Sequence, residues 1–416
     1  MSVEDRVRAA TRARTALVRE IRPLRLPEEP PGRARRFRHP RGARTWAVPL
    51  AAAAAVAAVA LTLVFVRQAA APHPEPVPSG SSAGVPRYYA ALTGAPTASD
   101  VTVSDDRTGK PVATVAPPAG QSFINVTAAA DDRTFVVTSQ VGQDQIDGGA
   151  VDVWYLLRVA PGTARPAQLT KLPIKPVGGA VGDVEFLAAS LSPDASELAV
   201  VTAATSGLDV DVNTLKTTLR IYSVSAGAPL RTWTANRGVL EANGLEFVAL
   251  SWLADGRHLA FDTSVYQHST QTVEEALLDV TSPGGDLMAH SRIVFAMPQS
   301  PLDPCDALSL SPDGGTVICG TQSKAVPAAG CAARGPAFTA YSVSTGKPVR
   351  VLYRDRTDCG NRQLIPLWSD SGARHVIVVQ ADAPAATSPR FALVTGGRLV
   401  EFPPTEKPPV YYLAAF

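Results

Sequence analysis

The chain has 416 residues, of which 45% are hydrophobic and 18% are charged. This length and composition allow a large buried core and exclude a chain that is disordered as a whole. The net charge of +2 is the sum of two unequal parts, because residues 1–45 carry +8 (13 arginines, 5 acids) and residues 46–416 carry −6. Phosphate binding needs a basic face, so this distribution argues against nucleic acid as a partner of the main body.

Residues 1–45 are predicted to form a basic cytoplasmic tail with a short amphipathic helix. A capping-box pattern at residues 2–5 is followed by apolar residues at helical spacing, and four prolines between residues 23 and 31 then end the helix. The apolar face carries the candidate partner-binding residues Val7, Leu17 and Ile21. Such a helix lies on the membrane surface or docks a cytoplasmic protein, and the sequence leaves both alternatives open.

Residues 46–66 are predicted to form a single transmembrane helix. They contain no charged residue over 21 positions, the length that spans a hydrocarbon core of about 30 Å. Seven Arg or His residues precede this run in residues 33–44, which by the positive-inside rule puts the N-terminus in the cytoplasm and the C-terminal part outside the cell membrane. A signal peptide cleaved near residues 69–71 is the alternative. Residues 67–86, rich in Pro, Ala and Ser, are predicted to form a stalk.

Residues 87–416 contain a repeat of about 60 residues made of short strand-like runs and turns. The best copies of one marker are Leu191-Ser192-Pro193-Asp194 and Leu310-Ser311-Pro312-Asp313-Gly314. Weaker copies centre on Asp131, Asp255 and Gly372, and consecutive copies are 58 to 63 residues apart. A second marker, T-G-K-P-V, stands at residues 108–112 and 345–349, with a relative at 226–230. Both markers are typical of tight turns between strands.

These two markers resemble the WD40-like repeats of TolB-type β-propellers, and the chain is similar to actinobacterial membrane-anchored propeller proteins with a short basic tail. The resemblance implies that the first marker joins the two inner strands of a blade and the second joins the two outer strands. Six outer hairpins are then predicted, near Gly109, Gly162, Gly227, Gly284, Gly346 and Gly396. Only five inner hairpins are visible, so we predict an all-β, six-bladed propeller whose first blade combines residues 87–92 with the final strand 410–416.

The four cysteines, Cys305, Cys319, Cys331 and Cys359, lie within 55 residues of the predicted extracellular part, where disulfides persist. Facing positions around the turn at residues 311–314 put Cys305 and Cys319 at the same end of one hairpin, so we rank pairing of Cys305 with Cys319 and of Cys331 with Cys359 first. Free buried thiols are the alternative. These bridges would fix loops on one face of the fifth blade, and we expect a ligand on that face.

Residues with the spacing of a catalytic or metal site are not evident, and we predict a non-enzyme without cofactor or metal. The five histidines after residue 66 are scattered, and His258 and His375 occupy equivalent positions after a turn, which favours a structural role. Two groups of oxygen ligands are candidate calcium loops, Asp144 with Asp147 and Asp152, and Asp209 with Asp211 and Asn213. The first group does not match the D-x-[DN]-x-[DN]-G spacing of a calcium loop, and the second is judged in the same way, so solvated loops are favoured for both.

The leading hypothesis is a non-catalytic binding module outside the membrane for a peptide, protein or cell-wall ligand. One alternative is a transmembrane regulator of the sigma-factor or envelope-stress type, whose tail binds a cytoplasmic partner. The tail lacks the H-x-x-x-C-x-x-C zinc motif of many anti-sigma domains. The other alternative is a propeller hydrolase or lyase.

Overall fold

The computed structural model describes residues 85–95, 98–142, 150–178, 185–204, 216–235, 250–267, 270–298, 305–321, 337–355, 362–382, 390–403 and 409–415. The chain divides into two compact units, residues 1–74 and 75–416, and every described residue belongs to the second. The predicted tail, transmembrane helix and most of the stalk therefore lie outside the described residues. Within the described ranges no helix is long and apolar enough to cross a bilayer.

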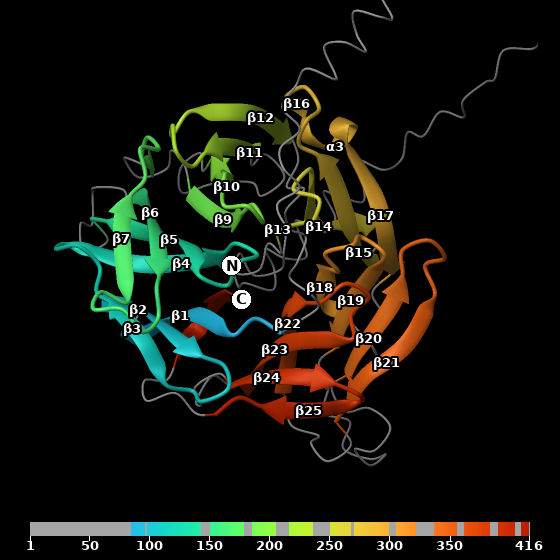
Figure 1. Ribbon diagram of the computed structural model, residues 1–416. Helices are drawn as coiled ribbons and strands as arrows, with labels where there is room; N and C mark the ends of the chain where they lie inside the picture. Colours follow the sequence, from blue (N-terminus) through green and yellow to red (C-terminus); the bar gives the residue numbers. More distant parts are fainter. Residues whose placement is uncertain are drawn as a thin grey trace, which may run out of the picture. The chain divides into compact units, whose positions relative to one another are not determined.

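The described strands form six sheets of a ring, which we call blades 1 to 6 (Figure 1). Blade 1 contains, from the inside outward, β26 (Pro409–Ala415), β1 (Tyr88–Ala95), β2 (Ala98–Asp105) and β3 (Pro111–Val115). Blade 2 contains β4 (Gln121–Ala128), β5 (Thr134–Val141), β6 (Val151–Val159) and β7 (Ala167–Lys171), and β8 (Val177–Gly178) also pairs with β6. Blade 3 contains β9 (Glu185–Leu191), β10 (Glu197–Ala204), β11 (Lys216–Ser223) and β12 (Pro229–Ala235).

Blade 4 contains β13 (Leu250–Trp252), β14 (His258–Gln267), β15 (Thr270–Asp279) and β17 (Ser291–Pro298). Between its last two strands lie β16 (Gly285–Asp286), which adds to the edge of β12, and the short helix α3 (Leu287–His290). Blade 5 contains β18 (Cys305–Leu310), β19 (Thr316–Thr321), β20 (Ala337–Ser342) and β21 (Pro348–Arg354). Blade 6 contains β22 (Arg362–Ser369), β23 (His375–Asp382), β24 (Arg390–Thr395) and β25 (Arg398–Glu401).

The ring closes as the sequence predicted, through a composite first blade. The C-terminal strand β26 pairs antiparallel with β1, with Ala90 opposite Ala415 and Ala91 opposite Ala414. The last strand of the chain therefore takes the innermost place in the blade that the first strand begins. The six-bladed, all-β architecture predicted from the repeats is confirmed.

The five inner hairpins are built by one device, an aspartate that accepts backbone hydrogen bonds across the turn. Asp131, Asp194, Asp255, Asp313 and Asp370 each accept from a backbone N–H two to five residues later. Because successive strands are antiparallel, the inner and outer hairpins lie at the same end of every sheet, which we call the turn face. Adjacent turns are also joined, since Ala130 N donates to Pro193 O at 3.0 Å and Ala254 N donates to Pro312 O at 2.8 Å.

The hydrophobic core lies between neighbouring blades, because each strand turns alternate side chains toward the blade on either side. Between blades 3 and 4, for example, Trp233 and Ile221 pack in one cluster with Phe261 and Leu278. A similar cluster between blades 5 and 6 contains Leu352 and Val394. These sheet-on-sheet contacts place the outer strand of one blade beside the turns of the next.

Candidate functional site

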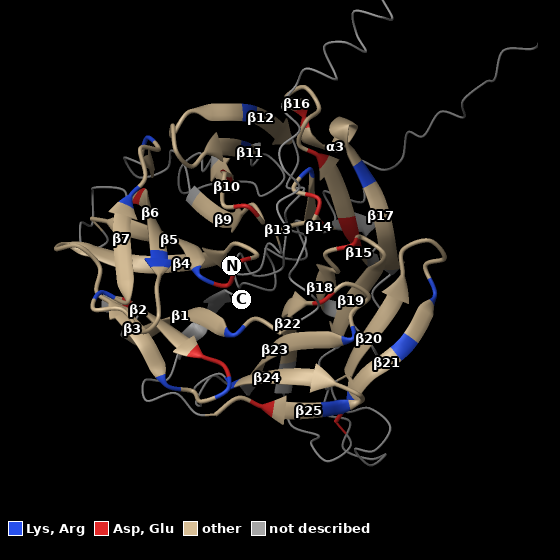
Figure 2. Cartoon of the chain, viewed as in Figure 1, with Lys and Arg blue, Asp and Glu red and all other residues tan. Residues whose placement is uncertain are grey.

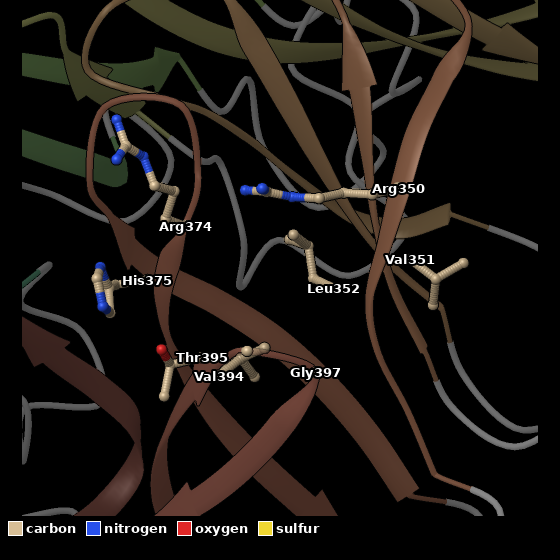
Figure 3. A pocket seen from close by; sticks show the side chains of 9 residues that line it. Arg350, Val351, Leu352, Arg374, His375, Val394, Thr395 and Gly397 are labelled. Atoms are coloured by element: carbon tan, nitrogen blue, oxygen red, sulfur yellow. The ribbon is translucent and has the colours of Figure 1, made fainter.

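A groove of about 380 Å³ lies on the turn face between blades 5 and 6 (Figure 3). Its walls come from the outer strand of blade 5 and from both hairpin turns of blade 6. The lining residues are Arg350, Val351, Leu352, Arg374, His375, Val394, Thr395, Gly396 and Gly397. Leu352 and Val394 are buried and belong to the core cluster between the two blades, so the floor of the groove is apolar.

Arg350 crosses from blade 5 to blade 6. Its guanidinium donates to the carbonyl oxygen of Gly372, 2.9 Å away, and to that of Ala373. Figure 3 shows the side chain extended toward the loop that carries Arg374. Arg350 is therefore held by the turn, and it fixes the distance between the two walls.

His375 is also held by its turn. Its Nδ1 lies 2.9 Å from Oδ2 of Asp370, and the other carboxylate oxygen of Asp370 accepts from the backbone N–H of His375 at 2.8 Å. In blade 4, His258 has the same relation to Asp255, with Nδ1 2.6 Å from Oδ2. The equivalence of the two histidines predicted from the repeat is thus confirmed. Each is the first residue of the second strand of its blade, and its ring binds the aspartate of the preceding turn.

Arginine stands at the position of Arg374 in blades 1, 2 and 4 as well, and in blade 2 Arg133 pairs with the adjacent Asp132 at 3.8 Å. In blades 1 and 4 the arginine pairs instead with an aspartate of the neighbouring strand. In blade 4, Arg257 Nε lies 3.1 Å from each carboxylate oxygen of Asp279, which faces His258 on the neighbouring strand. This guanidinium lowers the pKa of Asp279 well below its usual range, helped by hydrogen bonds from Thr281. In blade 1, Arg87 Nε lies 3.1 Å from Asp105, which faces Tyr88.

In blade 6 the residue that faces His375 is Thr395, not an aspartate. The exposed guanidinium of Arg374 accordingly makes no ion pair with any carboxylate in the part of the chain that the structure describes. Thr395 is followed by Gly396 and Gly397, both at positive φ, and no atom lies within 4 Å of the position that a side chain would occupy at either glycine. The groove therefore presents a guanidinium and a hydroxyl beside an open, side-chain-free turn.

The charge of the groove is positive. Two arginines line it and no carboxylate does, and Figure 2 shows further basic residues on β21 and β25. A second groove, of about 310 Å³ between blades 3 and 4, contains Arg231 at the strand position equivalent to Arg350 but also contains Glu197. The groove between blades 5 and 6 is therefore the better candidate for an anionic ligand.

The residues singled out in the sequence have different outcomes. A disulfide is present between Cys305 and Cys319, whose Cα atoms are 5.5 Å apart, and this is the pairing ranked first for these two residues. Cys331 and Cys359 lie outside the described residues, as do Val7, Leu17 and Ile21 in the tail. The disulfide lies at the end of blade 5 opposite the turn face, so the groove is not on the face where a ligand was expected.

The two candidate calcium loops lie almost entirely outside the described ranges. Asp144, Asp147, Asp209, Asp211 and Asn213 lie outside them. Asp152 is buried in β6, where the Gln140 amide lies 3.5 Å from its Oδ1. Among the described residues no three His, Cys, Asp or Glu side chains are placed to hold a metal ion.

Sequence reasoning missed the groove because its signal is a difference between repeats. The turn markers already align Arg231 with Arg350 and Arg257 with Arg374. Asp279 and Thr395, however, are matched only in the alignment that the strand register sets. The replacement of aspartate by Thr395 is visible only in that alignment.

The sequence matches no protein-family model and no curated protein. Solved structures with a similar fold include TolB from Acinetobacter baumannii, with 12% identity and a TM-score of 0.45 over 80% of this chain and 68% of that one. They also include an acylaminoacyl peptidase, with 9% identity and a TM-score of 0.42 over 76% of this chain and 44% of that one. A third is an oligogalacturonate lyase complexed with manganese, with 11% identity and a TM-score of 0.37 over 76% of each chain. At these identities the likeness concerns the fold alone and carries no activity over to this chain.

Proposed function

We propose that this chain is a membrane-anchored, extracytoplasmic propeller that binds a peptide or protein ligand without chemical conversion, through the groove between blades 5 and 6. The anchoring is supported by the uncharged run at residues 46–66 and by the arginines before it. The resemblance to actinobacterial membrane-anchored propellers supports the same topology. Protease protection in intact cells, read with antibodies against each end, tests it: a protected C-terminal end would contradict the proposal.

The observation that carries the binding role is the composition of the groove. It combines an apolar floor with hydrogen-bond donors, and one of its arginines, Arg374, has no ionic partner in the described ranges. Its rim is formed by the outer strand β21, whose Val349 and Val351 are 63% and 51% exposed. Apolar surface beside oriented polar groups is typical of ligand and peptide sites.

The test is a selection of displayed random peptides on the full-length chain in nanodiscs, followed by affinity measurements with the synthetic peptides recovered. Val351 lines the groove, whereas Val349 lies on the same strand and does not. We expect Val351→Asp to weaken binding about tenfold or more and Val349→Asp to leave it nearly unchanged, since both side chains are too exposed for either change to unfold the blade. If the peptides bind both variants with the same affinity as the unaltered chain, the groove is excluded as their binding site.

The regulator and the hydrolase or lyase remain hypotheses from the sequence. For the regulator, the decisive result is that one cytoplasmic protein binds residues 1–45 of the full chain specifically, and that Leu17→Asp or Ile21→Asp abolishes this binding. For an enzyme, it is turnover of a selected peptide by the full chain.

A further inference from the structure

We propose that the groove recognises an acidic side chain of an extended peptide, whose carboxylate lies between Arg374 and Thr395 and takes the place that an aspartate of the chain itself occupies in blades 1 and 4. This inference rests on the proposed binding function and adds the chemistry of the ligand. Its first support is the strand register. The same pair of strand positions holds an arginine–aspartate pair in blade 4, whereas blade 6 keeps the arginine and lacks the acid.

The internal pair of blade 4 shows how such a carboxylate is held. Asp279 accepts from the Arg257 guanidinium and, through Oδ1, from the backbone N–H of Thr281 at 2.9 Å and its hydroxyl at 2.6 Å. The residue two places after Thr395 is Gly397, which corresponds to Thr281 and belongs to an exposed turn. Blade 6 thus keeps the arginine and the turn backbone, while its hydroxyl comes from Thr395 at the position of Asp279 and not from the position of Thr281. A carboxylate supplied from outside would complete the set.

The charges around this position favour an anion. Asp370 lies beside the groove, but the residue is buried, and its carboxylate already accepts from His375 and from the backbone N–H groups of Arg374 and His375. The exposed carboxylate of Glu401 on β25 pairs with Arg390 at 3.6 Å. An incoming carboxylate therefore meets Arg374 without a competing acid in the groove lining.

The edge of blade 5 favours a peptide over a small free anion. In blade 3 the outer strand β12 carries an added parallel strand, with Trp233 opposite Gly285 and Thr234 opposite Asp286. In blade 5 the equivalent strand β21 is the last of its sheet among the described strands. An extended peptide can add to such an edge by backbone hydrogen bonds, place apolar side chains on Val351 and direct an acidic one into the groove.

The experiment compares two acetylated, amidated pentapeptides, Val-Thr-Asp-Val-Thr and Val-Thr-Asn-Val-Thr, titrated into the full-length chain in nanodiscs. Binding is followed by the NMR signal of the Arg374 side-chain Nε–H, assigned by its loss in Arg374→Gln. We expect the aspartate peptide to shift this signal saturably and to bind about tenfold more tightly than the asparagine peptide, with the difference reduced at high salt.

Two variants and a control sharpen the result. Thr395→Asp would give Arg374 an internal aspartate partner in blade 6, like the one that Arg257 has in blade 4. We therefore expect it to remove the preference for the aspartate peptide while the chain stays folded. Arg374→Gln should remove the same preference, measured by calorimetry. Arg257→Gln is the matched control, because that arginine is already paired with Asp279; it should leave peptide binding unchanged.

Equal binding of the two peptides to the unaltered chain, with loss on Val351→Asp, would overturn the carboxylate proposal and leave the groove as a binding site. If neither peptide binds but acetate alone shifts the Arg374 signal, the groove is a simple anion site, and the proposal that it binds a peptide is overturned. A peptide preference that survives both Thr395→Asp and Arg374→Gln would place the ligand elsewhere.

Discussion

The indole Nε1 of Trp252 donates a hydrogen bond to the carbonyl oxygen of Ser190, 3.0 Å away, and so joins the innermost strands of blades 4 and 3. Both residues are buried. Trp252→Phe keeps an aromatic ring but leaves the Ser190 carbonyl without this donor, so we expect a loss of about 1–3 kcal/mol in the free energy of unfolding. Urea unfolding followed by circular dichroism measures it.

Trp154 provides the matched comparison for this hydrogen bond. It is fully buried, stacks on Tyr222 with ring centroids 6.4 Å apart, and its Nε1 has no acceptor among the described residues. Trp154→Phe makes the same chemical change but removes an unsatisfied donor, which offsets part of the cost of lost packing. If Trp154→Phe proves at least as costly as Trp252→Phe, the inter-blade hydrogen bond contributes little.

The disulfide between Cys305 and Cys319 links the two inner strands of blade 5 across a sequence separation of 14 residues. A loop of this size contributes about 3 kcal/mol by restricting the unfolded chain. We expect the double change Cys305→Ala and Cys319→Ala to lower the unfolding free energy by about that amount, because both positions are buried and accept a small apolar side chain. An unchanged denaturation midpoint under non-reducing conditions would show that the bridge adds no stability.

The second marker of the repeat contains a glycine whose requirement differs between blades. Gly227 and Gly346 occupy the same turn position, with φ of +67° and +64°. A Cβ at Gly227 would lie 2.2 Å from the carbonyl oxygen of Pro173, whereas one at Gly346 would meet nothing within 4 Å.

We therefore expect Gly346→Ala to cost about 1 kcal/mol, for the left-handed conformation alone, and Gly227→Ala to cost roughly 3 kcal/mol or more, since backbone must move as well. The two melting temperatures, compared with that of the unaltered chain, measure the difference. Equal losses would mean that the segment containing Pro173 yields without cost.

Most of the fold was predictable because short turn motifs, each of which specifies a hairpin locally, recur in most of the repeats. The aspartate turns at Asp194 and Asp313 and the glycine turns at Gly109 and Gly346 each specify a hairpin through a few neighbouring residues, so they were recognisable without tertiary information. Ring closure by the last strand also followed, since one inner hairpin was missing from the count. The site did not follow, because it depends on which side chains of two blades meet. Thr395 draws attention only when strand pairing places it where Asp279 stands in blade 4.

The closure itself is testable by shortening the C-terminus. Removing residues 409–416 deletes β26 and leaves β1 as an unpaired inner edge next to the buried Ala90 and Ala91. We expect a broad or absent thermal transition and increased aggregation, because the ring loses the strand that joins its ends. Deleting Phe416 alone, which follows the strand, is the control. A full deletion that melts like the intact chain would contradict a structural role for this closure.

Stability should also depend on the protonation of Asp106, which follows β2. Its carboxylate is half-buried, and Oδ1 has no hydrogen-bond partner among the described residues. Burial, together with the adjacent charge of Asp105, raises the pKa of Asp106 from 3.8 to about 6. Between these two pH values the folded chain retains a proton that the unfolded chain releases, so this group lowers stability as pH rises from about 4 to about 6.

Asp106→Asn tests this contribution together with its coupling to the adjacent Asp105, the carboxylate whose charge acts on it. We expect the variant to be more stable than the unaltered chain at pH 7 to 8 and the difference to shrink as pH falls below about 3, where the aspartate is largely protonated in both states. Urea unfolding at several pH values measures it. A difference that is constant with pH would show that Asp106 keeps an ordinary pKa in the folded chain.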